Sequence, residues 1–91
     1  MTPQEIRIGN YIFSKETQEP QKITGIDLES PYIDAITFDY LEYQDIEPIS
    51  LTEEWLAKLP KKFTYPKWIK YVHTLQNWYW IQNNCNKELK I

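Results

Sequence analysis

Most residues of this chain that could do chemistry lie in one stretch, KYVHTLQNWYW, residues 70 to 80. On a helix that turns about 100° per residue, the apolar members fall on one arc with the width of a core-facing stripe. These predicted core residues are Tyr71, Val72, Leu75, Trp78 and Tyr79. A second face gathers an imidazole, three amides and one indole from His73, Gln76, Asn77, Trp80 and Asn84. The stretch therefore predicts a core face and a separate face for binding.

Trp80 is the residue that most needs an explanation on the binding face. A tryptophan directed away from the core leaves a large apolar area in water unless something covers it. One cover is the protein's own strand half, with the amides bonded to strand-edge carbonyls. A second is another subunit, since Trp and Tyr dominate interface energetics. A third is a flat ring such as a nucleobase, stacked on Trp80 and bonded to Gln76 and Asn77. In that case Lys67 or Lys70 would lie near its phosphates.

The same residue types argue against catalysis. His73 is the only histidine and Cys85 the only thiol, and they are twelve residues apart. On one helix this spacing is about 18 Å, too far for a nucleophile and its base. Gly9 and Gly25 stand alone, so no glycine-rich phosphate loop is present. With one cysteine, neither an internal disulfide nor a cysteine metal cluster can form. We expect no enzyme activity, no cofactor and no metal.

Charge divides the chain into two unequal parts. Residues 1–59 hold four basic and twelve acidic residues, a net charge of −8, whereas residues 60–91 hold six lysines and one acid, a net charge of +5. This asymmetry is compatible with head-to-tail self-association, with an anionic ligand at the basic end, or simply with solvated lysines.

A basic and aromatic segment, KKFTYPKWIKY, also permits single-stranded nucleic acid as a ligand. It interleaves Lys61, Lys62, Lys67 and Lys70 with Phe63, Tyr65, Trp68 and Tyr71. The acidic strand half would repel a long phosphate chain, and the pI near 5.1 is far from the values typical of such binders. Long nucleic acid is therefore the less favoured partner.

The first half of the chain, residues 1–49, predicts short strands. The strand-like segments are RIGNYIFS, QKITGIDL, YIDAITFDY and YQDIEPIS. Gly9 with Asn10, and Gly25, suit bends or bulges, and Pro48 confines the last segment to an edge or a strand end. Kinked strands of this kind predict a small bent barrel or sheet of the SH3-like type.

The second half, residues 50–91, predicts helices. Ser50 with Glu53, or Thr52 alone, has the spacing of an N-terminal cap. It would open a short helix over about Leu51 to Leu59, and a longer helix is predicted over about Lys70 to Asn84. The 91 residues should thus form one small α+β domain.

Targeting signals are not evident in the sequence. No apolar run approaches the roughly 20 residues that cross a bilayer, and the N-terminal residues lack the pattern of a leader peptide. The single cysteine favours a reducing compartment. We expect a cytoplasmic protein without membrane contact, and a homo-oligomer, because so short a chain gains stability from pairing.

Three phrases, IRIGNYIF, IEPISLTEEWLAKL and IKYVHTLQNWYW, resemble a family of small proteins encoded on Bacteroidetes chromosomes, prophages and phages. The resemblance spans most of the chain. Relatives of that family carry a longer, strand-rich insert between the two helical phrases, where this chain has only residues 60–69. The resemblance implies a shared fold and an origin in mobile elements, and it transfers no catalytic residue.

These observations predict a non-enzymatic binding protein that acts as an oligomer. Given the resemblance, its sharpest version is a counter-defence sponge for a nucleotide-type signal molecule in the host cytoplasm. A host-protein interaction module or inhibitor, and a single-stranded nucleic-acid binder, are the alternatives. The expected binding residues are His73, Gln76, Asn77, Trp80, Asn84, Lys67 and Lys70.

Overall fold

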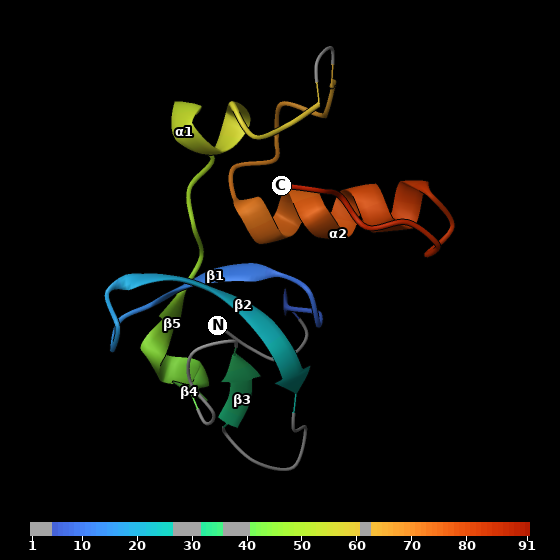
Figure 1. Cartoon of the computed structure of the whole chain (residues 1–91). Coiled ribbons are helices and arrows are strands. Elements are labelled where there is room, and N and C mark those ends of the chain that lie inside the picture. The colour runs from blue at the N-terminus through green and yellow to red at the C-terminus, as the bar shows by residue number, and fades with distance from the viewer. Residues whose placement is uncertain (1–4, 27–31, 36–40, 61–62) are drawn as a thin grey trace.

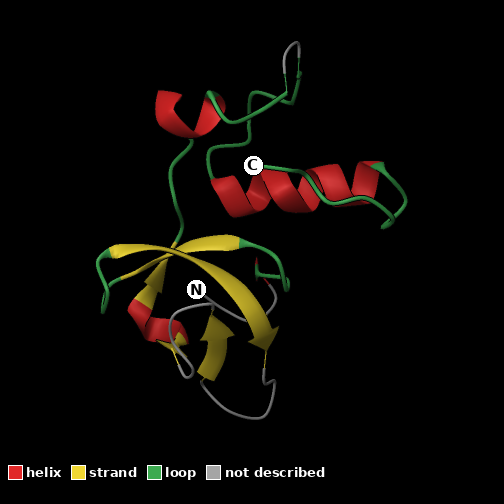
Figure 2. Ribbon diagram, viewed as in Figure 1, coloured by secondary structure: helices red, strands yellow, loops and turns green. Residues whose placement is uncertain are grey.

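The computed structural model describes residues 5–26, 32–35, 41–60 and 63–91. Figures 1 and 2 show a curved antiparallel sheet on one side and helices on the other. The predicted small α+β fold is therefore confirmed, whereas a closed barrel of the SH3-like type stays a prediction. No helix in the described ranges is long and apolar enough to cross a membrane.

The sheet has the strand order β4-β3-β2-β1-β5, and every neighbouring pair is antiparallel. The strands are β1 (Tyr11–Ser14), β2 (Glu19–Ile26), β3 (Tyr32–Ala35), β4 (Leu41–Glu42) and β5 (Ile46–Glu47). A short 3-10 helix, η2 (Tyr43–Asp45), joins β4 to β5 although these strands lie at opposite ends of the order. Because three residues must connect the two ends, the sheet curls strongly, as Figure 1 shows.

Both predicted backbone irregularities are present. Gly9 has a φ of +100°, a conformation that L side chains rarely adopt, and it turns the chain into β1. The pairing of β2 with β3 shifts register between Ile23 and Gly25, which is the predicted bulge. The predicted strand ends at Asp27, Leu28 and residues 36–40 lie outside the described residues.

β1 is covered on both faces and joins the two halves of the molecule. On one face, Ile12 is fully buried within a cluster of sheet residues. On the other, Tyr11 and Phe13 pack against a second cluster that includes Trp55 and Val72 from the helical half. The two-residue alternation of a strand thus connects the sheet core to the helical core.

The first helix is shorter than predicted. α1 covers Glu53–Leu56, and Thr52 precedes it without a side-chain capping hydrogen bond. The helix does not begin at residue 51 because the Leu51 amide donates to the Lys70 carbonyl at 3.0 Å, while Ser50 forms a β-bridge with Tyr71. These extended contacts occupy the residues that were expected to form the first turn.

The second helix, α2 (Val72–Gln82), is also shorter at both ends than the predicted range of residues 70 to 84. Tyr71 is extended at its start because of the bridge to Ser50. At its end, Asn84 and Cys85 adopt left-handed φ angles of 55° and 57°. A helix often ends with a glycine in this left-handed conformation. Asn84 takes that place here, because asparagine tolerates the conformation. The prediction that Asn84 lies on a helical face is therefore wrong.

After this turn the chain returns along α2, as Figure 1 shows. Leu89 on the returning segment is buried in a third core cluster with Ile69 and Leu75. Of the predicted core stripe, Val72 and Leu75 are fully buried, but Tyr71 is 41% exposed. Helical periodicity places Tyr71 in the core stripe only if the helix includes it, whereas Tyr71 precedes the helix in extended conformation.

Candidate functional site

Gln76 lies at the junction between α2 and the start of β1, and only 2% of it is exposed. Its Oε1 accepts from the Tyr11 amide at 2.8 Å, and its Nε2 donates to the Gly9 carbonyl at 2.9 Å. The side chain thus pairs with backbone groups much as a neighbouring strand would. Both ends of the Gln76 amide are engaged by the chain itself.

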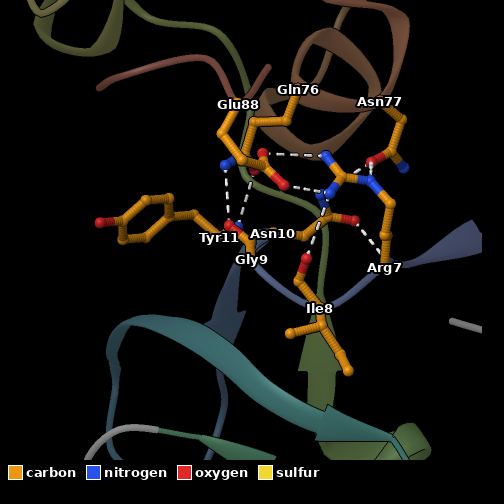
Figure 3. A network of polar contacts seen from close by, with 8 residues as sticks. All are labelled: Arg7, Ile8, Gly9, Asn10, Tyr11, Gln76, Asn77 and Glu88. Atoms are coloured by element: carbon orange, nitrogen blue, oxygen red, sulfur yellow. Dashed lines mark hydrogen bonds and ion pairs between the residues drawn. The ribbon is translucent and has the colours of Figure 1, made fainter. Parts of the chain in front are cut away.

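Asn77 makes a similar set of contacts one residue further along α2 (Figure 3). Its Oδ1 accepts from Asn10 Nδ2 at 2.8 Å and from Arg7 Nε at 3.2 Å. Its Nδ2 donates to the Glu5 carbonyl at 3.4 Å. Asn10 is fully buried, so its hydrogen bond to Asn77 satisfies a polar group that water cannot reach.

Arg7 connects this junction to Trp80 and to the returning C-terminal segment. Its guanidinium pairs with the Glu88 carboxylate through Nη1, and through Nη2 at 3.1 Å. Its central carbon lies 4.5 Å from the centre of the Trp80 ring. Of the three covers considered for Trp80, the chain's own N-terminal half is the one that makes these contacts.

The other predicted binding residues lie apart from this junction. Asn84 is exposed in the turn after α2. Lys67 directs its Nζ to the Tyr65 ring at 5.4 Å, and the exposed Lys70 accepts the Leu51 amide through its carbonyl. His73 faces a hollow that also reaches Asn77. The seven predicted residues therefore do not form one continuous site.

The hollow beside His73 has a volume of about 710 Å³. Its apolar lining includes Trp68, Tyr71, Trp78 and Ile81, and we call it the aromatic hollow. Trp68 is 65% and Ile81 64% exposed, values that are high for side chains of this size and type. The volume is in the usual range for a site that takes a small molecule.

The polar lining residues of this hollow are Glu5, His73, Thr74 and Asn77. His73 is 8% exposed, its ring stacks on Tyr71 at 6.0 Å between centroids, and its Nδ1 has no hydrogen-bond partner among the described residues. Burial lowers the pKa of His73 below 6.5, and the negative charge of Glu5 opposes that shift. The imidazole is therefore neutral near pH 7.

A second hollow, of about 570 Å³, lies between the Gly9 bend, β2 and the C-terminal segment. Its lining includes Lys22, Gln76, Glu88 and Lys90. Gln76 bonds to backbone and Glu88 pairs with Arg7, so internal contacts already use two of these polar side chains. The aromatic hollow is the stronger candidate, since its large side chains are exposed.

The basic and aromatic segment does not present a row of free rings. Phe63 lies within ring contact of Tyr65, Trp78 and Tyr79 at centroid distances of 6.3, 6.5 and 5.7 Å. All four rings pack against the third core cluster. Trp68 and Tyr71 remain as the exposed rings of the described part of this segment. The segment therefore offers few exposed rings on which successive bases of a nucleic acid could stack.

Only two of the predicted binding residues, His73 and Asn77, line the aromatic hollow. The lining residues that were not predicted as part of a site are Glu5, Pro48, Trp68, Tyr71, Thr74, Trp78 and Ile81. The sequence indicates Trp68 only as one ring of the basic and aromatic segment. Ile81 could have been suspected, because it follows Asn77 by four positions and so shares a side of α2 with it. Glu5 carried no signal, since only the folded chain brings it to α2.

Among the described residues, no group of three histidine, cysteine or acidic side chains could hold a metal ion. Cys85 is exposed in the turn that follows α2, whereas His73 is buried in the first turn of α2. The thiol and the imidazole thus lie at opposite ends of the helix. Comparisons with protein-family models, curated proteins and solved structures gave no match to this chain.

Proposed function

We propose that this chain is a non-enzymatic binding protein that recognises a protein partner through the aromatic hollow. One observation carries the proposal: Trp68, Tyr71 and Ile81, at 65%, 41% and 64% exposed, gather around a single hollow. Large apolar side chains that meet at one surface depression are typical of interaction sites. Trp and Tyr also supply most of the energy at such interfaces.

The rest of the molecule acts as a scaffold for this surface. We infer that the curled sheet is an SH3-like platform onto which α2 docks through Gln76 and Asn77. This docking would hold α2 and the segment before it in place, so Trp68 and Tyr71 need little reordering when a partner binds. Such preorganisation lowers the entropic cost of association.

A nucleotide-type ligand is the second candidate. It is favoured by the 710 Å³ volume and by the exposed rings on which a base could stack. Its phosphates would have to reach Lys67 or Lys70, which flank Trp68 in sequence but are not part of the lining. The acidic Glu5 lies in the lining instead, which supports a phosphorylated ligand less well than a protein.

The resemblance to proteins of Bacteroidetes phages and prophages suggests that the partner is a protein of the bacterial host. A protein of such origin that binds a host protein would act as an inhibitor or a counter-defence factor. A second copy of the chain could occupy the same surface, since the exposed apolar residues would then be buried in a homo-oligomer.

The test is site-directed photo-cross-linking. Benzoylphenylalanine is placed at Ile81, and at Ile8 as a matched control that is also exposed, at 53%, but lies beside the second hollow. In bacterial lysate we expect one defined cross-linked protein from position 81 and none from position 8. Trp68→Ala should remove the product. Equal products from both positions would contradict the proposal, and a product with the purified chain alone would identify a second copy as the occupant.

A further inference from the structure

We propose that two copies of this chain exchange the segment that follows the turn after α2. This segment, residues 87–91, is called the strap. In the exchanged dimer, the strap of each copy occupies on the other copy the place that it occupies here on its own. The surface under the strap is thus an interaction surface whose partner is a second copy. The inference goes beyond the proposed function and does not depend on the aromatic hollow.

Side chains hold the strap to the rest of the molecule. The Glu88 carboxylate pairs with the Arg7 guanidinium, as Figure 3 shows, and Leu89 is buried in the third core cluster. Ile91 packs on the second and the third clusters. To the other described residues, residues 87–91 make no backbone-to-backbone hydrogen bond. The strap can therefore leave its place without the loss of any helix or strand.

The turn before the strap is closed by two consecutive residues in left-handed conformation. Asn84 has a φ of 55° and Cys85 a φ of 57°. Asparagine tolerates this region, whereas a cysteine there carries the steric strain of an ordinary L side chain. The exposed Cys85 thiol has no packing role that would require this conformation. A turn that opens to extended or helical backbone, both of which have negative φ, releases the strain.

A second copy restores the contacts that an opened turn loses. Leu89, 6% exposed when the strap is in place, would otherwise face water, and Arg7 would lose its carboxylate partner. A second opened copy offers an identical strap and an identical surface for it. The lost contacts therefore form again between the two chains, which is the general route of domain swapping. The exchanged dimer keeps the strap contacts and releases the strain of two turns.

Charge favours the approach of the two copies. The strap holds Lys87, Lys90 and Glu88, a net charge of 2 − 1 = +1, whereas residues 1–59 have a net charge of −8. The strap of one copy is thus attracted to the strand half of the other. Residues 88–91 also line the second hollow, together with residues of β1 and β2. In the exchanged dimer, that hollow is lined by two chains.

The first experiment changes only the turn. Sedimentation over a dilution series from tens of micromolar, with a reductant present, measures the dissociation constant of the dimer. The natural chain should be a dimer at the upper end of this range. Cys85→Gly should raise the dissociation constant by about a hundredfold, tenfold for each turn, because glycine adopts the left-handed conformation without strain. Cys85→Val should lower it, because a β-branched residue is strained most there.

Cys85→Ala is the matched control for this series. It removes the thiol but keeps an ordinary L residue in the turn, so the dissociation constant should not change. Equal dissociation constants for the glycine and valine variants, or a natural chain that stays monomeric, would overturn the exchange. A dimer that dissociates in Trp68→Ala but ignores the turn variants is held by the aromatic hollow, and this result also rules out the exchange.

The second experiment reverses one ion pair between two chains. Arg7→Glu and Glu88→Arg each place like charges against one another, whether the strap is exchanged or not. When the two variants are unfolded and refolded together, an exchanged heterodimer has an acid opposite an arginine at both straps. Native mass spectrometry should show this heterodimer in excess, with a melting temperature above that of either variant alone. Absence of the heterodimer contradicts the proposal. If the mixture does not fold, the turn series still decides.

Cross-linking at position 8 locates the strap directly. Ile8 and Leu89 line the same second hollow, so benzoylphenylalanine at position 8 lies within reach of the strap. With the purified chain, exchange should give a product of twice the mass of the chain, and Cys85→Gly should remove most of it. Cross-links within single chains alone would sink the idea. Products of two copies are recognised by their mass, so the comparison of positions 81 and 8 in lysate still reports on host proteins.

Discussion

The two tryptophans of greatest interest, Trp80 and Trp68, have opposite roles in the structure. Trp80 is half-buried with the Arg7 guanidinium on its ring, whereas Trp68 is 65% exposed. A cation on a ring, and the apolar area that a tryptophan buries, both contribute to stability, while an exposed tryptophan contributes little. The same residue type therefore serves the fold at one position and is available for binding at the other.

The first prediction compares the two residues directly. Trp80→Ala should lower the free energy of unfolding by about 1 to 2 kcal/mol, because it removes buried area and the contact with Arg7. Trp68→Ala should change it by less than about 0.5 kcal/mol, as for exposed substitutions in general. Urea unfolding of both variants is the measurement. A larger loss for Trp68 than for Trp80 would reverse the assignment of the two rings.

The second prediction concerns His73 and pH. Its pKa is below 6.5 in the folded chain because of burial, so the unfolded chain binds a proton more readily as the pH falls through 6.5. The stabilising effect of the neutral imidazole is thus complete above that pH. It is lost as the pH falls toward the pKa of His73 in the folded chain. Below that pKa, the protonation of His73 no longer changes the free energy of unfolding.

His73→Gln should remove this dependence, which urea unfolding at pH 7.5 and pH 5.5 would measure. The natural chain and the variant share all their other ionisable groups, and the charge of Glu5 acts on His73 in the natural chain. The informative quantity is therefore the difference between the two proteins at each pH. If the natural chain and the variant lose stability equally between these pH values, His73 does not titrate as described.

At the scale of elements, α2 is held by side-chain amides as well as by apolar contacts. Gln76 and Asn77 accept and donate hydrogen bonds with the segment from Glu5 to Tyr11, at the point where β1 begins. Leu75 and Val72 meanwhile join the apolar clusters. The helix thus has two buried sides, one apolar and one polar.

The third prediction tests the polar side. Gln76→Ala should destabilise the protein by about 1 to 3 kcal/mol, because it leaves the Tyr11 amide and the Gly9 carbonyl without their partner in a buried place. Gln82→Ala, on the exposed end of the same helix, should change the stability by less than about 0.5 kcal/mol. Thermal melts of the two variants suffice. Equal melting temperatures would show that the Gln76 contacts are weak.

The sequence predicted the elements better than it predicted the faces of α2. The strands, the bend at Gly9 and the bulge at Gly25 follow from local residue preferences, and they are present. The polar face of α2 was interpreted as a binding surface because amides are usually exposed. Its burial depends on Asn10 and Gly9, nearly seventy residues away, and helical periodicity carries no information about such contacts.

The helix ends were missed for a related reason. The bridge between Ser50 and Tyr71 shortens both helices at their starts, and it pairs residues that no local pattern connects. Tyr71 consequently moves from the predicted core to the exposed lining of the aromatic hollow. This one long-range contact explains the changed place of Tyr71, and the contacts of Gln76 and Asn77 explain why the rest of the predicted face is not an open site.

At the scale of the whole molecule, three apolar clusters run from the sheet to the C-terminal segment. Tyr11 and Phe13 of β1 pack on the second cluster, and Leu51 and Ile91 pack on both the second and the third. Residues shared between clusters couple their unfolding. The chain should therefore unfold in a single transition.

The fourth prediction uses this coupling. Leu75→Ala should lower the free energy of unfolding by about 2 to 5 kcal/mol, the range for a fully buried leucine. For so small a domain this is a large part of the total. Because the clusters are linked, far-ultraviolet circular dichroism and tryptophan fluorescence should shift together. Separate transitions for the two signals would show that sheet and helices unfold independently.

The last prediction concerns self-association, which the charge division and the exposed apolar residues both favour. Residues 1–59 carry a net charge of −8 and residues 60–91 one of +5, so opposite halves of two copies attract. Burial of Trp68 and Ile81 would add apolar stabilisation. Sedimentation at tens of micromolar should give a native mass of at least twice 11.0 kDa.

Added salt and the substitution Trp68→Ala distinguish attraction between the charged halves from apolar burial at the aromatic hollow. Exposed charges more than about 8 to 10 Å apart are screened at physiological ionic strength, so an assembly held by the charged halves should dissociate as salt is added. An assembly held by the aromatic hollow should resist salt and dissociate in Trp68→Ala. A monomer at low salt would remove self-association. The aromatic hollow would then remain available to a partner protein of another kind.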